Sequence, residues 1–455
     1  MVKLHKVLIA CLLAMGVLMT SPLKAEGLGL VEIYQMALEN DPRIHQARAQ
    51  LERAQEATPQ ARARLLPSVS LSGQVQESWS DGEQIGFDPA TQDVGLVDFE
   101  SNTETTSYGV EIRQTLFQWD AWVGLSEAEA RVAEAEARYD GALQDLLIRV
   151  AEAYFGLLVA EETLATRVTT RESFEMEKER AEFSREVGTA SRTDVEEARA
   201  ALDRARSDEI AAERQLEGAR EALYELTGRY IQQVQGPGSD VEPSLPEPGD
   251  IDFWVERALD NNPEVVAARF LAESAEGQVR QARSGHYPTL DLVASRQWMD
   301  SSGDNPFQNQ DTVNDNIQLQ LNVPLFAGGQ TRSQVREAQA GEREAWAGVE
   351  IAMREVRRGA RDAFLGIRSS VAQISALEQA VRSSEAAVEA TEIGVEVGTR
   401  STVDLLNARR ELSNARTQLS EVRYAYLIDT LRLQRAVGQL DGEQMEMLGA
   451  LFLEE

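Results

Sequence analysis

Four segments of the chain alternate apolar and polar residues with a period of two, near 68–76, 107–116, 288–298 and 317–323. In the first segment Val69, Leu71 and Val75 fall on one side, and serine and glutamine fall on the other. This period predicts β-strands with one face in an apolar setting and the other in a polar one. Each strand is about long enough to cross a bilayer, although a soluble half-buried sheet would give the same pattern.

The remaining sequence predicts helices in a repeated order. Each half has a short helix (about 29–39; 251–260), a second helix (about 43–64; 264–284), a strand pair, a long helix (about 120–186; 330–396) and a return helix (about 193–228; 403–437). The long segments lack proline and would each span about 100 Å. A return helix stacked on a second helix covers about 87 Å, nearly the same length. Such lengths indicate coiled-coil-like packing.

The two halves share sequence as well as order. Ala37–Pro42 recurs as Ala258–Pro263, and Val187-Gly188-Thr189 recurs as Val397-Gly398-Thr399. A period near 210 residues is too long for a solenoid and predicts a duplicated half-subunit. We expect a signal peptide over 1–25, a first structural repeat over 26–240 and a second over 241–455.

The signal peptide follows from the first residues. Lys3 and Lys6 precede an apolar run, and the sequence before Glu26 suits cleavage. Cys11 is the one cysteine and would be removed, so the mature chain would have no thiol chemistry. No later apolar stretch is long enough for a transmembrane helix.

Composition argues against several function classes. The sequence shows no phosphate-binding loop, hydrolase elbow or zinc-protease motif, so we expect no enzyme activity, no cofactor and no metal. The formal net charge of −31 argues against nucleic acid as a partner and favours cations.

Four strands cannot close a barrel, and a bilayer does not tolerate open sheet edges. Eight strands is the usual minimum, and three copies would supply twelve. The chain must therefore assemble with further copies, and the fold that we expect from the pattern is mainly α with four β-strands per chain.

The connections within the two strand pairs are acidic and contain no lysine or arginine. Their acids are Asp81, Glu83, Asp88, Asp93, Asp98, Glu100 and Glu104 in the first pair, and Asp300, Asp304, Asp311 and Asp315 in the second. We expect long outward loops, which would form either a negative vestibule that concentrates cations or simply a solvated rim.

At this point the chain resembles the TolC family of outer-membrane factors over essentially its whole mature length. The resemblance rests on the duplication and on an ordered set of motifs: Leu66-Pro67, Thr115-Leu116-Phe117, Val323–Gly329 and Val397–Ala408. It implies a mainly α fold with a membrane β-barrel, formed by a homotrimer in the cell outer membrane, in contact with outer-membrane lipid. Each chain would add four strands to a twelve-strand barrel and long helices to an α-helical barrel, the tunnel across the periplasm. It also implies two partners, a periplasmic adaptor protein and an inner-membrane pump or ABC exporter.

The resemblance also implies roles for the turns between long and return helices. In the family these turns lie at the periplasmic tip and meet the adaptor, and the matching residues here are Val187, Gly188, Thr189, Val397, Gly398 and Thr399. Glycine accepts the positive φ of a turn that leaves a helix, which alone would explain both glycines.

The family places acidic side chains in the closed aperture, and the matching positions are Asp404 and Asn407. Three copies of Asp404 would attract cations, whereas Asn407 departs from the commoner acidic residue. Ser401 with Asp404, and Ser191 with Asp194, equally suit helix N-caps, and the roles can coexist.

Thr193, Asp194 and Arg400 match positions that hold the family's tips shut. An Asp194–Arg400 pair could therefore form. Val395 stands where a tyrosine is usual, so the latch would be weaker or differently built.

These observations favour a passive exit duct for small toxic compounds or secreted proteins. A structural coiled-coil tether or adhesin would explain the helices but not the matched strand pairs.

Overall fold

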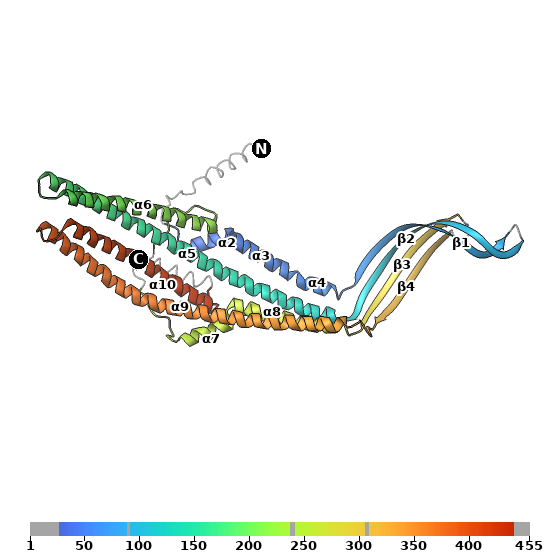
Figure 1. The fold of residues 1–455 in the computed structure, drawn as a ribbon. Helices are drawn as coiled ribbons and strands as arrows, with labels where there is room; N and C mark the ends of the chain where they lie inside the picture. Colours follow the sequence, from blue (N-terminus) through green and yellow to red (C-terminus); the bar gives the residue numbers. More distant parts are fainter. Residues whose placement is uncertain (1–26, 89–91, 237–241, 305–308, 441–455) are drawn as a thin grey trace, which may run out of the picture. The chain divides into compact units, whose positions relative to one another are not determined.

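The computed structural model describes residues 27–88, 92–236, 242–304 and 309–440 (Figure 1). The predicted signal peptide and the predicted repeat boundary at 240–241 lie outside these residues. The elements are α2 (Leu30–Asn40), α3 (Pro42–Gln55), α4 (Ala57–Ala63), β1 (Ser68–Asp88), β2 (Asp93–Gln118), α5 (Trp119–Glu186), α6 (Arg192–Thr227), α7 (Ile251–Asn261), α8 (Pro263–Ser284), β3 (Thr289–Gly303), β4 (Gln310–Asn322), α9 (Gln330–Glu396) and α10 (Thr402–Ala436).

The predicted helices nearly coincide with the observed ones, with one exception. The single helix expected over 43–64 is broken between α3 and α4, at Glu56. Pro59 lies three residues later, and a proline ring inside a helix clashes with the carbonyl of the residue four positions earlier, here Gln55. No helix of the described residues combines the length and apolarity needed to cross a membrane.

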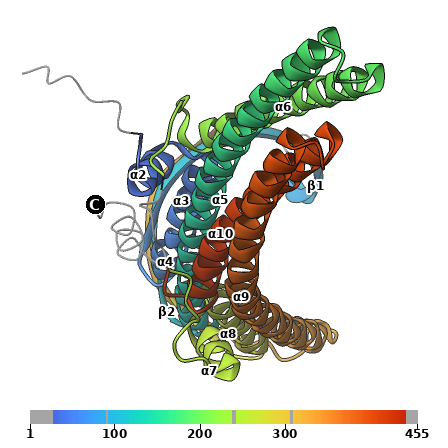
Figure 2. The ribbon, with the colours of Figure 1, turned by 90° about the vertical axis from the view of Figure 1, so that its left-hand side faces the viewer.

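The chain divides into two compact units, and each takes residues from both halves of the sequence. Among the described residues, the first unit contains those of 27–46, 141–262 and 356–440, and the second contains those of 47–140 and 263–355. In the first unit the α5–α6 pair, here the first hairpin, lies beside the α9–α10 pair, the second hairpin (Figures 1 and 2). A buried cluster of Phe174, Ala201, Leu202, Ala205 and Leu406 joins α5, α6 and α10.

The core of the first unit also contains aromatic side chains. Tyr154 and Phe155 of α5 are fully buried, and Phe155 stacks on Tyr424 of α10 with ring centroids 5.6 Å apart. The Tyr424 hydroxyl donates a 2.7 Å hydrogen bond to Glu162. Burial, reinforced by this hydrogen bond, raises the pKa of Tyr424 above its usual value, so the hydroxyl remains a donor.

The second unit holds a four-stranded antiparallel sheet in the order β1-β2-β3-β4. Strands β1 and β2 pair without interruption from Ser68–Arg113 to Asp88–Asp93, and β3 joins β2 only as far as Thr103. The β1–β2 hairpin therefore continues past β3 and β4 as a two-stranded ribbon. The prediction of a long acidic loop between the first two strands is wrong, because its residues pair as strands instead.

The register decides which face the acids share. Apolar Val69 and Leu71 of β1 stand on the same face as Ile112 and Val110 of β2. The same face carries the opposed acidic pairs Glu77–Glu104, Asp81–Glu100, Glu83–Asp98 and Asp300–Asp311. The opposite face is mostly serine, threonine, asparagine, glutamine and glycine. Side chains alternate along a strand, so these acids cannot line the polar face, and the register does not support a vestibule built from them.

Equivalent glycines end the two return helices and predict a contrast in stability. Gly228 and Gly438 both adopt left-handed conformations, with φ of 66° and 67°. A Cβ at Gly438 would lie 2.4 Å from the backbone oxygen of Asn261, whereas at Gly228 the nearest atom would be the Asn40 Cβ at 3.8 Å. Gly228→Ala should cost about 1–2 kcal/mol for the left-handed backbone. Gly438→Ala must also displace backbone, which should add about 1–3 kcal/mol. Thermal unfolding in detergent compares the two variants, and equal losses would contradict this account.

Candidate functional site at the helical tips

The turn at the end of each hairpin closes in the same way. The Gly188 amide donates to Arg185 and the Thr189 amide to Ser184, at 3.0 and 2.8 Å, and Gly188 has a φ of 82°. In the second hairpin Gly398 donates to Val395 and Thr399 to Gly394, at 3.1 and 2.8 Å. This pair of bonds around a left-handed glycine is the Schellman motif, which satisfies the last carbonyls of a helix. The positive φ expected at both glycines is confirmed.

These turns leave apolar side chains in solvent. Val187 is 58% exposed and Val397 is 67% exposed, and Gly188, Thr189, Gly398 and Thr399 are exposed beside them. The two predicted tip motifs therefore form two similar exposed surfaces, one on each hairpin.

A capping box begins each return helix. The Asp194 amide donates to Ser191 Oγ at 3.2 Å, and the Ser191 amide donates to Asp194 Oδ2 at 2.8 Å. The Asp404 amide donates to Ser401 Oγ at 3.2 Å, and Asp404 Oδ2 accepts from the Ser401 amide at 2.9 Å. The sequence prediction of N-caps is confirmed at both positions. Asp404 also accepts the Ser401 hydroxyl at 2.9 Å, a contact without a counterpart in the first hairpin's box.

Asp404 is held in its ionised form. The hydrogen bonds from the Ser401 amide and hydroxyl, followed by the positive charge of Arg400, lower the pKa of Asp404 below its usual value of 3.8. Hydrogen bonds to a carboxylate favour the charged form. Arg400 runs over Gly394, where a Cβ would come within 2.6 Å of the Arg400 Cγ. The glycine therefore gives the arginine stem room to lie along the end of α9.

The predicted aperture residues all lie near the start of the return helices, but not all of them contact one another. Asp404 is partly exposed, and Asn407, one turn later on α10, is exposed. Thr193 is exposed and Asp194 is half-buried on α6. Among the described residues of this chain, no ion pair links Asp194 to Arg400.

Above the tips, each hairpin carries ion pairs that sequence reasoning missed. Arg199 of α6 bonds Glu182 of α5, and Arg409 of α10 bonds Glu392 of α9, both at 3.3 Å. Two turns further, Arg206 bonds Glu175 and Arg416 bonds Glu385, at 3.2 and 2.7 Å. Both members of each pair recur 210 residues later, the offset already visible in the tip motifs. A comparison of charges at that offset could have found them.

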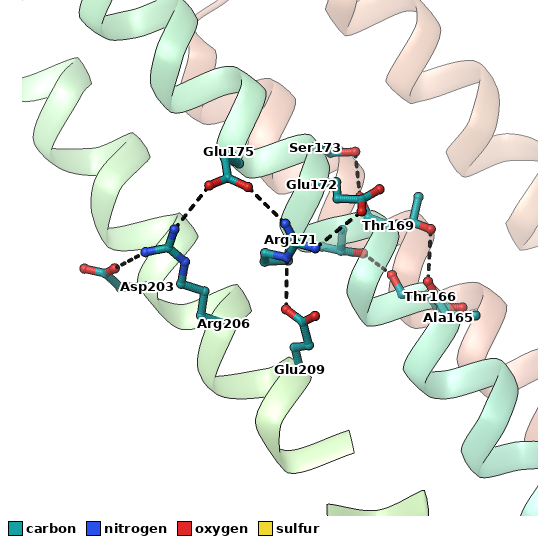
Figure 3. Close-up of polar contacts among 11 residues, drawn as sticks. Ala165, Thr166, Thr169, Arg171, Glu172, Ser173, Glu175, Asp203, Arg206 and Glu209 are labelled. Atoms are coloured by element: carbon teal, nitrogen blue, oxygen red, sulfur yellow. Dashed lines mark hydrogen bonds and ion pairs between the residues drawn. The ribbon is translucent and has the colours of Figure 1, made fainter. Parts of the chain in front are cut away.

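The first hairpin contains a further arginine in the same series of ion pairs between its two helices (Figure 3). Arg171 of α5 bonds Glu209 of α6 at 3.0 Å and Glu175 at 2.9 Å, so Glu175 is shared between Arg171 and Arg206. On the same stretch of α5, the hydroxyls of Thr169 and Ser173 bond carbonyls one turn back, which satisfies them within the helix.

A groove of about 350 Å³ runs between α5 and α10, with Val388 of α9 at its side. Residues with a hydroxyl group or a guanidinium group contribute to its lining: Thr166, Thr169, Thr170, Ser173, Ser413, Arg409 and Arg416. Two hydrogen bonds reach Ser413 Oγ of α10 from α5, one from Thr170 Oγ1 at 3.2 Å and one from Arg167 Nη1 at 3.4 Å. Polar contacts between α5 and α10 therefore accompany the buried apolar contacts that join the two hairpins.

Known proteins share this arrangement of duplicated helical hairpins and strand pairs. A family model described as "Outer membrane efflux protein" matches residues 33–229 and 254–439. The chain belongs to this family.

Individual members of the outer membrane efflux protein family align over nearly the whole chain. The outer membrane protein TolC of Vibrio cholerae is 33% identical, over 91% of this chain and 92% of that protein. The alkaline protease secretion protein AprF of Pseudomonas aeruginosa is 31% identical, over 94% of this chain and 88% of that protein. The resemblance to the TolC family is confirmed, and the protein is an outer-membrane protein.

Solved structures show the same fold. The outer membrane protein VceC of Vibrio cholerae superposes with a TM-score of 0.73 at 22% identity, over 90% of this chain and 96% of that chain. A CusC structure superposes with a TM-score of 0.76 at 20% identity, over 90% and 92%. Members of the outer membrane efflux protein family are channels and not enzymes.

Proposed function

We propose that three copies of this chain form a channel-tunnel through the outer membrane, the passive exit duct of a tripartite efflux pump or a type I secretion system. The observation that carries the proposal is the sheet. Its edge strands β1 and β4 have no outer neighbour among the described residues, and apolar side chains on one face are largely exposed, Leu71 and Ile317 at 78% and 79%. Pairing β1 of one copy with β4 of the next removes the open edges along the four-stranded part of the sheet and leaves this face for lipid.

The aromatic side chains of the sheet fit this arrangement. Tyr108 and Trp298 stack at 5.2 Å on the apolar face, and the opposed acids Asp300 and Asp311 follow directly along the strands. Trp119 and Tyr287 meet at the helical end of the sheet, with centroids 6.3 Å apart. Aromatic girdles at both borders of an apolar band are typical of outer-membrane barrels. The acidic pairs would then stand outside the barrel, beyond the lipid chains.

The proposal includes partners at the tips. The exposed turns around Gly188 and Gly398 would bind a periplasmic adaptor protein, which connects the duct to an inner-membrane pump or an ABC exporter. Asp404, Asn407, Thr193, Asp194 and Arg400 would line or hold the periplasmic aperture. The support is their position at the ends of two equivalent hairpins.

We expect the cargo to depend on which inner-membrane partner binds. The names of the relatives include both protein secretion and resistance to a small toxic compound. AprF and PrtF are named for protease secretion, and the more distant FusA is named for fusaric acid resistance. We propose transport for this chain without choosing between small toxic compounds and proteins.

Native mass spectrometry in detergent, followed by planar-bilayer recording, tests this function. We expect a mass of three chains and discrete ionic currents, because only closure by several copies satisfies the sheet edges. A monomer or dimer would contradict the barrel. Trimers that conduct no ions would instead favour the coiled-coil tether.

A further inference from the structure

The two strand pairs end differently where the chain passes into the long helices. The pairing of β1 with β2 ends at Arg113, yet β2 continues over Gln114–Gln118, because β3 pairs with that stretch. The pairing of β3 with β4 ends at Asn322, and β4 ends there too. Residues 323–327 therefore follow β4 without strand structure.

This segment after β4 repeats the stretch of β2 that β3 covers. Leu116-Phe117 recurs as Leu325-Phe326, 209 residues later, and the same offset relates Arg113 to Asn322. Leu116 and Phe117 are 49% and 40% exposed, whereas Leu325 and Phe326 are 92% and 90% exposed. The second occurrence of the motif thus lacks the neighbour that the first occurrence has.

The strand that would supply this neighbour in a trimer is β1 of the next copy. Leu66-Pro67 before β1 recurs as Tyr287-Pro288 before β3, so β1 and β3 are equivalent strands. In the sheet β3 lies beside β2, whereas the corresponding edge of β4 is open among the described residues. An open strand edge is a template for a strand of another chain.

The pairing of β2 with β3 contains a β-bulge that determines which side chains share a face. Gln114 lies opposite Leu292. Phe117 lies opposite Leu290, and Leu116 stands at the irregularity between the two pairs. A bulge adds one residue to a strand, so the side chains beyond it change face. The bulge therefore places Phe117 on the apolar face of the sheet.

The same register can be transferred to β4 and the next copy. It sets Val323 opposite Leu71 and Phe326 opposite Val69, with Leu325 in the bulge. Each pair is apolar on both strands. Both pairs also lie on the face that the proposed barrel turns to lipid, so the transferred register agrees with the side-chain pattern of both strands.

The residues around Leu325 fit a bulged strand that is followed by a turn. Within strands, proline is found at edges and bulges, and Pro324 directly precedes the bulge position. Gly328 and Gly329 have φ of 61° and 90°, and a Cβ at either glycine would meet no atom within 4 Å. This turn separates the segment from α9, so the segment can become a strand without a change in the helix.

We propose that Val323–Ala327 folds as an extension of β4 only on β1 of a second copy, and that the bulge at Leu325 fixes the register between the copies. The inference rests on the proposed trimer. It names the surface through which the copies join at the helical end of the sheet, and the partner of that surface is the same chain.

Disulfide trapping tests the register. Val69→Cys with Phe326→Cys should give covalent trimers on oxidation, because each copy is then bonded to the next. Leu71→Cys with Phe326→Cys is the control pair. It keeps the face but lies two residues out of register, where Cα atoms are roughly 8 Å apart, beyond the roughly 7 Å that a disulfide spans. The control pair should give no covalent trimer.

A third pair shows whether side chains at this position can form a disulfide. Phe117→Cys with Leu290→Cys joins the equivalent positions within one chain, where the register is observed. It should oxidise without joining chains.

Hydrogen exchange of the detergent-solubilised parent tests strand formation without any substitution. In the trimer the amides of residues 325–327 should be protected as strongly as those of residues 116–118, because both stretches are then paired. Both are measured in the same experiment.

Each outcome has a distinct meaning. The strand extension is overturned if residues 325–327 exchange freely in trimers whose residues 116–118 are protected. The register is overturned if the control pair forms covalent trimers as well as the first pair, or if only the pair within one chain oxidises. A Phe326→Cys thiol that reacts with a lipid-soluble maleimide but forms no disulfide would assign the segment to lipid. Absence of trimers from the parent would overturn the proposed function itself.

Discussion

Arg149→Met is expected to destabilise the first unit by about 3–5 kcal/mol, because it leaves a buried carboxylate without its cation. Asp41 lies between α2 and α3 and is 1% exposed. Its Oδ2 is 2.6 Å from Arg149 Nη1 of α5, and its Oδ1 accepts the Arg43 amide at 2.6 Å. The pair anchors the start of α3 against the long helix. Thermal unfolding of the detergent-solubilised protein measures the loss.

The second half of the chain supplies the control. There the equivalent of Asp41 is Asn262, a neutral side chain that donates to the Ala436 carbonyl at 3.0 Å, and the equivalent of Arg149 is Gly359. The sequence has thus changed both partners together. Asp41→Asn combined with Arg149→Met should recover most of the lost stability. If the double variant is as unstable as Arg149→Met alone, the loss comes from packing of the arginine stem rather than from the buried charge.

Asp404→Asn is expected to reduce the preference for cations over anions roughly tenfold, since a unit charge within about 4 Å of an ion is worth about 1 kcal/mol even in bulk water. Three copies would place three such charges in one aperture. Asparagine keeps an oxygen that can accept the Ser401 amide, so the variant removes charge while preserving the cap. Reversal potentials under a salt gradient measure the preference.

Ser401→Ala provides the reciprocal control, because it removes the hydroxyl of the cap and keeps the carboxylate. Its channels should remain cation-selective. The lowered pKa of Asp404 also gives a sign to the pH dependence. Protonation at low pH should abolish the selectivity, and the hydrogen bonds from Ser401, which lower the pKa of Asp404, should move that loss to lower pH in the parent than in Ser401→Ala. Unchanged selectivity in Asp404→Asn would leave helix capping as its supported role.

Much of this architecture was predictable from local rules. Proline-free stretches with good helix formers predicted α5 and α9, and the glycine between Val187 and Thr189 predicted the left-handed turn. The extent of β1 and β2 was not predicted, because a segment rich in aspartate and glutamate looks like a loop. Cross-strand pairing with a ribbon partner overrides that composition, and only the register shows which face the acids occupy.

The candidate site was predicted in outline but not in its contacts. The capping pattern in the sequence identified Ser401 and Asp404 correctly, since both residues lie within one helical turn. The Arg409–Glu177 contact joins residues on separate hairpins. Which side chains face each other there depends on how the helices are rotated about their axes, and sequence spacing does not determine that rotation.

The polar face of the sheet has a consequence for transport. If three copies close with the apolar face on lipid, the wall of the pore consists mainly of hydroxyl and amide side chains. Its few charges include Glu111 and Arg113, which pair with each other at 3.1 Å, and Asp291, which accepts from Thr115. A passing solute would replace hydrogen bonds to water with similar hydrogen bonds to these side chains, at many equivalent positions. No single position would then bind the solute strongly, so the barrel would contribute little selectivity. The charged helical tips would determine which solutes pass.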